Sequence, residues 1–188
     1  MTSLKTSIKT ITYLSDIGCL EIQGASLAAN QIRNLMSQYM HLCDDLSYPD
    51  IAQEIADLFC EDAIWEGLGS LYQNKLGRYS GRKNIAQMMA RYISEPAHFA
   101  INVHYLTSEY IDIGAENEAI GRWKMLQVST FRAGGSHLNS AELVIRFKKA
   151  GERWLIDHFT TRNLLSRPVD YWHSPVDLPV PDTTRSPE

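Results

Sequence analysis

The sequence has few cysteines, and their pattern supports neither a disulfide framework nor a metal site. Cys19, Cys43 and Cys60 are widely separated, odd in number and without a CxxC or Cys/His ligand spacing. Cys43 and Cys60 fall in apolar stretches, as buried free thiols commonly do. We therefore predict no disulfide scaffold and no structural zinc, and we assign these thiols no chemistry.

Strong charge and long apolar runs are also missing. The 188 residues carry 18 Lys and Arg against 22 Asp and Glu, a formal net charge of -4, and the basic residues are scattered. A nucleic-acid interface needs a basic patch, so nucleic acid is not an expected partner. The apolar runs fall far short of the roughly 20 residues that cross a bilayer. The N-terminal residues do not have the pattern of a signal peptide. We expect a cytoplasmic protein without a membrane partner.

Hydrophobic residues make up 44% of the chain and aromatic residues 10%, enough for one substantial core. Residues 1–24 lack a long helical pattern and are predicted to form an N-terminal extension. Residues 25–165 are predicted to form a single domain. Residues 166–188 contain five prolines and are predicted to form a tail, because so many prolines interrupt both helices and strands.

Within that domain, the hydrophobic pattern changes from helical to strand-like. Apolar residues from Ile32 to Leu46 recur at helical spacing, a second helix follows Pro49, and a third is predicted over residues 83–93. A short strand is predicted at residues 62–69, between the second and third helices. Four stretches with strand character follow Pro96, at residues 97–113, 118–131, 137–149 and 153–163. Helices followed by a long antiparallel meander indicate the α+β class, and long twisted strands predict a curved sheet around a hollow.

Several motifs occur in an order that resembles a known family. They are Ile32-x-x-Leu35 leading to Tyr39 and Asp44, the segment from Leu58 to Trp65, Gly81, His98-Phe99-x-x-Asn102, and the segment from Gly151 to Ile156. Together they resemble the SnoaL-like branch of the NTF2-like superfamily, which includes scytalone dehydratase, bile acid 7α-dehydratase, hexachlorocyclohexane dehydrochlorinase and polyketide cyclases. The resemblance covers about residues 25–163. It implies a cystatin-like α+β barrel, in which a cone-shaped, strongly bent antiparallel sheet packs against three N-terminal helices.

The same resemblance implies a catalytic pair. In the family's dehydratases and dehydrochlorinase, a His after the third helix removes a proton from carbon, and an Asp near the end of the first helix orients it. His98 and Asp44 occupy these positions, with Asp45 as the alternative to Asp44, and Tyr39 would donate a hydrogen bond to the substrate. A His can act as a base near neutral pH, and a carboxylate fixes its tautomer. Asp44, however, lies about 140° from Tyr39 on a helical wheel, so a bend in the chain would be needed to turn it inward.

Further residues are predicted to contact the substrate, although each could instead be ordinary core. Strand alternation places Asn102 and His104 on the same face as His98 if no bulge intervenes. The predicted substrate-binding residues are Trp65, Asn102, His104, Trp123, Met125, Leu143 and Phe159. For His98, the alternative is a hydrogen-bonding residue without a chemical role.

We predict a lyase of the dehydratase type, or an isomerase, that acts on a small hydrophobic, cyclic substrate without a cofactor or a metal. Ser129 stands where scytalone dehydratase has a catalytic His, which argues against that particular enzyme. The alternative is a non-catalytic ligand-binding or assembly module, similar to the small subunit of a ring-hydroxylating dioxygenase. In either case the outer face of the sheet needs cover, so we expect a homo-oligomer, either a dimer or a trimer.

Overall fold

The computed structural model describes residues 2–93, 96–114 and 117–170, with side chains from residue 23 onward. Most of the predicted tail, from residue 171, lies outside the described residues. In chain order the elements are α1 Thr2–Asp44, α2 Ile51–Ala56, β1 Phe59–Leu68, α3 Gly69–Lys75, β2 Arg78–Ser80, α4 Arg82–Ala90, β3 Phe99–Ile113, β4 Glu118–Phe131, β5 Ser136–Ala150 and β6 Arg153–Val169. None of the helices in this described part is long and apolar enough to cross a membrane.

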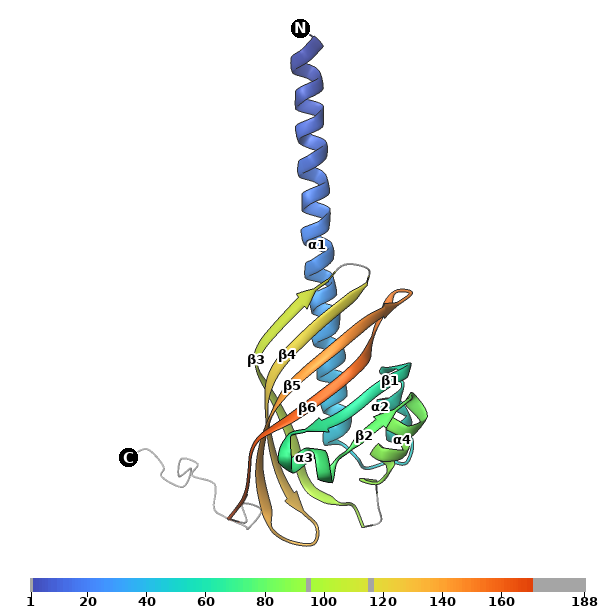
Figure 1. Ribbon diagram of the computed structural model, residues 1–188, viewed down its shortest axis with the longest axis vertical. Coiled ribbons are helices and arrows are strands. Elements are labelled where there is room, and N and C mark those ends of the chain that lie inside the picture. The colour runs from blue at the N-terminus through green and yellow to red at the C-terminus, as the bar shows by residue number, and fades with distance from the viewer. Residues whose placement is uncertain (1, 94–95, 115–116, 171–188) are drawn as a thin grey trace, which may run out of the picture.

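The strands form one curved, unclosed sheet in the order β2-β1-β6-β5-β4-β3 (Figure 1). Every neighbouring pair is antiparallel except β1 and β6, which run parallel. The predicted α+β class and bent sheet are therefore confirmed. The parallel pair was not predicted, and neither were α3 and β2, which lie largely between the strand predicted at residues 62–69 and the helix predicted at residues 83–93.

The last strand is longer than predicted. It continues to Val169, past the predicted start of the tail at Ser166, and Pro168 pairs with His137 of β5. Proline is tolerated at this point because β1 ends beside Arg162. Beyond Arg162, β6 therefore has only one neighbouring strand, and a residue without a backbone N–H fits such an edge.

Helix α1 is continuous from Thr2 to Asp44 and so runs through the predicted N-terminal extension. No proline, the residue that breaks helices most strongly, precedes Pro49. Figure 1 shows its N-terminal half extending beyond the sheet and its C-terminal half lying beside it. In that second half Ile32 and Met36 are buried in the core, where they contribute to the packing between helix and sheet.

A bulge in β3 helps to fix α1 against the sheet. The register between β3 and β4 shifts between Thr107 and Tyr110, where Ser108 has a φ of 52°. Glu109 then accepts hydrogen bonds from Arg33 of α1, at 2.6 Å, and from Nε1 of Trp123, at 3.2 Å. The carboxylate thus links the first helix to two strands, and it satisfies a buried indole N–H.

Candidate active site

A pocket of about 400 Å³ lies between the helices and the inner face of the sheet. It is lined by eight of the predicted residues, namely Tyr39, Trp65, His98, Asn102, His104, Met125, Leu143 and Phe159. Trp123, predicted to bind the substrate, is not part of this lining. Its ring packs edge-on against Phe147 and its indole nitrogen is bonded to Glu109, so Trp123 belongs to the core behind the pocket.

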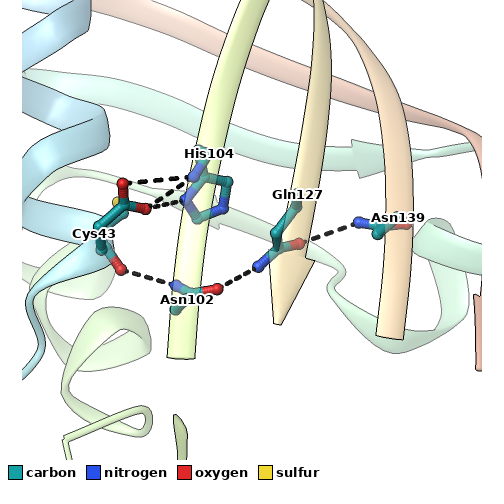
Figure 2. A network of polar contacts seen from close by, with 6 residues as sticks. Cys43, Asn102, His104, Gln127 and Asn139 are labelled. Atoms are coloured by element: carbon teal, nitrogen blue, oxygen red, sulfur yellow. Dashed lines mark hydrogen bonds and ion pairs between the residues drawn. The ribbon is translucent and has the colours of Figure 1, made fainter. Parts of the chain in front are cut away.

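Asp44 and His104 form a short side-chain contact at the wall of the pocket. Oδ1 of Asp44 lies 2.5 Å from Nδ1 of the His104 ring, and the same carboxylate accepts the backbone N–H of His104 at 3.0 Å. Figure 2 shows His104 on β3 opposite the end of α1 that carries Cys43. Both side chains are largely shielded, with 22% of Asp44 and 13% of His104 exposed. This arrangement leaves Nε2 as the ring nitrogen that does not face the carboxylate.

Asp44 therefore contacts His104 in this structure and not His98, the partner that we predicted. His98 lies in the same pocket, but its ring packs among aromatic rings, with centroids 4.6 Å from Phe99, 5.4 Å from Phe131 and 6.0 Å from Tyr92. Asp45, the alternative partner, is exposed. The physical reason is position along the chain, because six extended residues span about 20 Å and Asp44 lies beside the backbone of His104. In addition, a register shift between Phe99 and Ile101 breaks the alternation that would have placed His98 in line with Asn102 and His104.

Asp44 reaches His104 without a bend in the helix, although Asp44 itself is not part of the pocket lining. It is the last residue of α1, four residues after Met40, and four residues turn a helix by about 400°, or about 40° past a full turn. Met40 is buried and lines the pocket. Asp44 thus lies close to the buried face of α1 on which Met40 lies. A helical wheel that takes Tyr39 as the centre of the buried face places Asp44 outside that face.

The hydroxyl of Tyr39 is engaged on the protein side. It accepts a hydrogen bond from Nε1 of Trp65 at 3.1 Å, and Trp65 stacks on Phe159 with ring planes 5° apart. Burial raises the pKa of Tyr39 well above its ordinary value, and the neighbouring Cys43 raises it further. Burial also raises the pKa of Cys43, to about 12, although a hydrogen bond with Tyr39 partly opposes the shift. Both groups are therefore neutral near physiological pH.

Four amide side chains cross the inner face of the sheet as a continuous hydrogen-bonded row. Asn102 of β3, Gln127 of β4, Asn139 of β5 and Asn163 of β6 are joined by bonds of 2.8 Å, 3.1 Å and 2.8 Å. We call this row the amide relay. Figure 2 shows its first three members, beginning beside His104.

Sequence reasoning identified only Asn102 of the relay. Strand alternation could have found two more, because Gln127 lies two residues after Met125 and Asn139 four residues before Leu143. Met125 and Leu143 were both predicted to line the pocket, and such spacings share one face of a strand. Tyr72, whose hydroxyl accepts a hydrogen bond from Asn139, gave no comparable signal, because its helix α3 was not predicted.

Residues 25–160 match the SnoaL-like domain family. The chain belongs to this family. The match extends from α1 into β6 and so includes Asp44, His104 and the first three amides of the relay. Within the described residues, no group of three or more His, Cys, Asp or Glu side chains is placed to hold a metal ion.

Solved structures similar to this SnoaL-like chain show the same fold. A protein from Novosphingobium aromaticivorans, described provisionally as a scytalone dehydratase, is 17% identical with a TM-score of 0.65, and the match covers 78% of this chain and 91% of that one. The hexachlorocyclohexane dehydrochlorinase LinA-type3 from Novosphingobium barchaimii is 16% identical with a TM-score of 0.63, covering 78% and 92%. An NTF2-like protein with a cystatin-like fold, also from N. aromaticivorans, is 19% identical with a TM-score of 0.57, covering 77% and 88%.

A curated relative covers only a short part of the chain. The uncharacterized protein YuaK of Escherichia coli (strain K12) is 93% identical over 30 residues, which are 16% of this chain. The chain spans about a third of the length of that relative, because the match covers 32% of it. YuaK therefore adds no information on activity.

Proposed function

We propose that this SnoaL-like protein catalyses an elimination or an isomerisation of a small hydrophobic, cyclic substrate without a cofactor. His104 would act as the base, and Asp44 would position it. The observation that supports this assignment is the 2.5 Å contact between Oδ1 of Asp44 and Nδ1 of His104 at the wall of the pocket. A carboxylate in this place selects the neutral tautomer with the proton on Nδ1 and stabilises the imidazolium that forms later.

The proposed reaction needs only one proton-transfer group. Nε2 of His104 takes a proton from a carbon atom, and the C–H electron pair forms a C=C bond. In an elimination, the group on the next carbon departs with its bonding pair. If it is a hydroxyl, the imidazolium returns the proton to it and water is released. In an isomerisation of an unsaturated substrate, the new C=C bond displaces the electron pair of an existing double bond, and the carbon that receives this pair takes the proton from the imidazolium.

The pocket suits such a substrate in size and in chemistry. A volume of about 400 Å³ is in the range of small-molecule sites, which are mostly apolar with a few placed polar groups. The aromatic pair Trp65 and Phe159, together with Met125 and Leu143, provides apolar surface. Burying a flat ring against them would be favoured by the hydrophobic effect.

The test is an elimination assay with a panel of mono- and bicyclic β-hydroxy ketones, following the absorbance of the enone product in a buffer that contains EDTA. Removing a general base typically costs about 10²- to 10⁴-fold in rate, so His104→Ala should lose that much. His41→Ala is the matched control, because His41 is exposed on α1. His98→Ala should lose less than His104→Ala. Undiminished turnover by His104→Ala would remove the proposed base.

The assay also separates the catalytic proposal from the non-catalytic alternative. If the wild type binds the panel compounds but converts none of them, the result would favour a ligand-binding or assembly module. Co-purification with a larger iron-sulfur protein would then support the dioxygenase-subunit form of that alternative.

A further inference from the structure

The amide relay has a fixed direction because both of its ends meet backbone carbonyls. At one end, Nδ2 of Asn102 donates to the carbonyl oxygen of Cys43 at 2.9 Å. At the other end, Nδ2 of Asn163 donates to the carbonyl oxygens of Leu165, at 3.0 Å, and Ser140, at 3.3 Å. A carbonyl oxygen can only accept. Each terminal amide must therefore turn its NH₂ group toward its anchor.

The two anchors require the same orientation of the interior amides. With its NH₂ on Cys43, Asn102 presents its oxygen to Gln127, which must donate with Nε2. Gln127 then presents its oxygen to Nδ2 of Asn139, and the oxygen of Asn139 accepts from Nδ2 of Asn163. No amide in the row can be flipped without setting two oxygens or two NH₂ groups against each other.

This direction determines what the hydroxyl of Tyr72 can do. The NH₂ group of Asn139 has two hydrogens, one directed to Gln127 and the other to the Tyr72 oxygen. The hydroxyl therefore accepts from the relay, and its own hydrogen has no acceptor among the described residues. Tyr72 is buried, with 8% of its surface exposed, and it lines the pocket. A buried donor without a partner is costly, so a ligand atom that accepts this hydrogen would be favoured.

We propose that Tyr72 is the specificity-determining donor of the pocket and that it selects ligands with a carbonyl oxygen. A carbonyl oxygen only accepts, which complements a hydroxyl that is committed to donating. Tyr72 differs from Tyr39, whose hydroxyl accepts from an indole, Nε1 of Trp65, and not from the relay. The oxygens of Asn102, Gln127 and Asn139 already accept hydrogen bonds within the relay.

The inference rests on the proposed function only in taking the pocket as the ligand site, and it adds the chemical class of the ligand. A ketone oxygen on Tyr72 would carry the negative charge that develops when a proton is removed from a neighbouring carbon. A donor directed at that oxygen stabilises such a charge. The substrate class is accordingly a cyclic ketone, and cyclic compounds without a carbonyl group would be discriminated against.

The experiment compares two bicyclic probes of similar shape, 2-tetralone with a carbonyl group and tetralin without one. Binding is measured through tryptophan fluorescence, since Trp65 lines the pocket. The ratio of the two dissociation constants is compared between variants, which cancels the different solubilities of the probes. One buried hydrogen bond changes affinity by about fivefold to tenfold. Tyr72→Phe should reduce the wild-type preference for 2-tetralone by that factor.

Two further variants make the result specific. Asn139→Asp replaces the donor that faces Tyr72 with an acceptor, so the hydroxyl should turn its hydrogen to Asp and the preference should fall although Tyr72 is intact. Tyr110→Phe is the matched control, because Tyr110 is an exposed tyrosine on β3. Thermal melting confirms that each variant is folded. If Tyr72→Phe does not fold, two other measurements decide the question. One is the preference of Asn139→Asp. The other is the infrared carbonyl stretch of 2-tetralone bound to the wild type, which should lie at a lower frequency than in hexane.

The proposal is overturned if both variants keep the wild-type preference, or if the wild type binds the two probes equally or not at all. A carbonyl stretch equal to that in hexane contradicts it as well. Neither probe carries a leaving group, so the result does not depend on whether His104 acts as a base. A loss of preference in Tyr72→Phe with an unaffected His104→Ala would support this inference while contradicting the proposed function.

Discussion

One residue, His104, contacts the carboxylate of Asp44 twice: its backbone N–H donates to Oδ1 at 3.0 Å, and its ring Nδ1 lies 2.5 Å from the same oxygen. The backbone bond fixes the carboxylate relative to β3, and the ring bond fixes the imidazole relative to the carboxylate. The orientation of the imidazole therefore does not rely on a flexible contact between two side chains. For the base that we propose, such a hold would leave little entropy to lose on reaching a reactive geometry.

Replacement of Asp44 by Asn should test this coupling. The amide keeps the shape but not the charge, and its NH₂ group can favour the wrong His tautomer. We expect kcat for an accepted β-hydroxy ketone to fall by about 10²- to 10⁴-fold, while KM changes little because Asp44 is behind the ring. Asp45→Asn is the control, since Asp45 is exposed. Equal kcat values for Asp44→Asn and the wild type would show that the contact has no part in catalysis.

Gly121 is essential for the packing of the sheet. A Cβ atom at this position would overlap the ring of Trp123 and lie 3.1 Å from Phe147. Gly121→Ala should therefore displace the indole and break its hydrogen bond to Glu109. We expect urea denaturation to show a loss of about 1–3 kcal/mol or more in the free energy of unfolding.

Gly24→Ala is the matched comparison, because a Cβ there meets no atom within 4 Å. Alanine favours a helix over glycine by up to about 1 kcal/mol, so this change should be neutral or stabilising. Equal effects of the two substitutions would contradict the close packing described for Gly121.

The thiol of Cys43 should be unreactive in the folded protein. Burial raises its pKa to about 12, so the reactive thiolate would be only about 10⁻⁴ of the population near pH 8. Iodoacetamide labelling followed by peptide mass mapping should show slow modification of Cys43 in buffer and fast modification in urea. Equal rates in the two conditions would show that the pocket does not shield this residue.

The contribution of Glu66 to stability should depend on pH. Burial alone would raise the pKa of Glu66, but hydrogen bonds with His158 and Arg78 outweigh it and lower the pKa below 4.5. A carboxylate with a lowered pKa stabilises the fold above its unfolded pKa, and this contribution is lost as the pH falls through the folded value.

Glu66→Gln should accordingly be less stable than the wild type near neutral pH, by up to about 1 kcal/mol, and the difference should shrink well below pH 4.5. Chemical denaturation at both pH values measures this change, with the exposed Glu152→Gln as control. A difference that stays constant or grows on acidification would contradict the assigned role of the ion pairs.

The fold could be largely predicted from the sequence because its strongest signals are local. Turn residues at Gly114, Gly134 and Gly151 separate long strands, and the predicted bounds of β4 agree with the structure. The parallel contact between β1 and β6 could not be predicted in this way. It joins residues about a hundred positions apart, and nothing in the pattern of either strand specifies its neighbour.

The site was predicted less well than the fold because it depends on where the end of α1 meets β3. That meeting point decides whether His98 or His104 contacts Asp44, and nothing in the sequence of either element specifies it. The face of Asp44, by contrast, could have been found from Met40, one turn earlier on the helix. The position of Tyr72 in the site could not be predicted for another reason. Its hydrogen-bond partner, Asn139, lies on a strand far away in the chain.

The most direct test of the account is the tautomeric state of His104, measured by long-range ¹⁵N–¹H NMR of the imidazole ring near neutral pH. We predict that neutral His104 carries its proton on Nδ1, with Nε2 unprotonated and available as the base, and that Asp44→Asn weakens this preference. The resonances of His98 should not change between the two proteins. A ring protonated on Nε2, or one whose tautomer is unaffected by Asp44→Asn, would contradict the assignment of His104 and Asp44 as the catalytic pair.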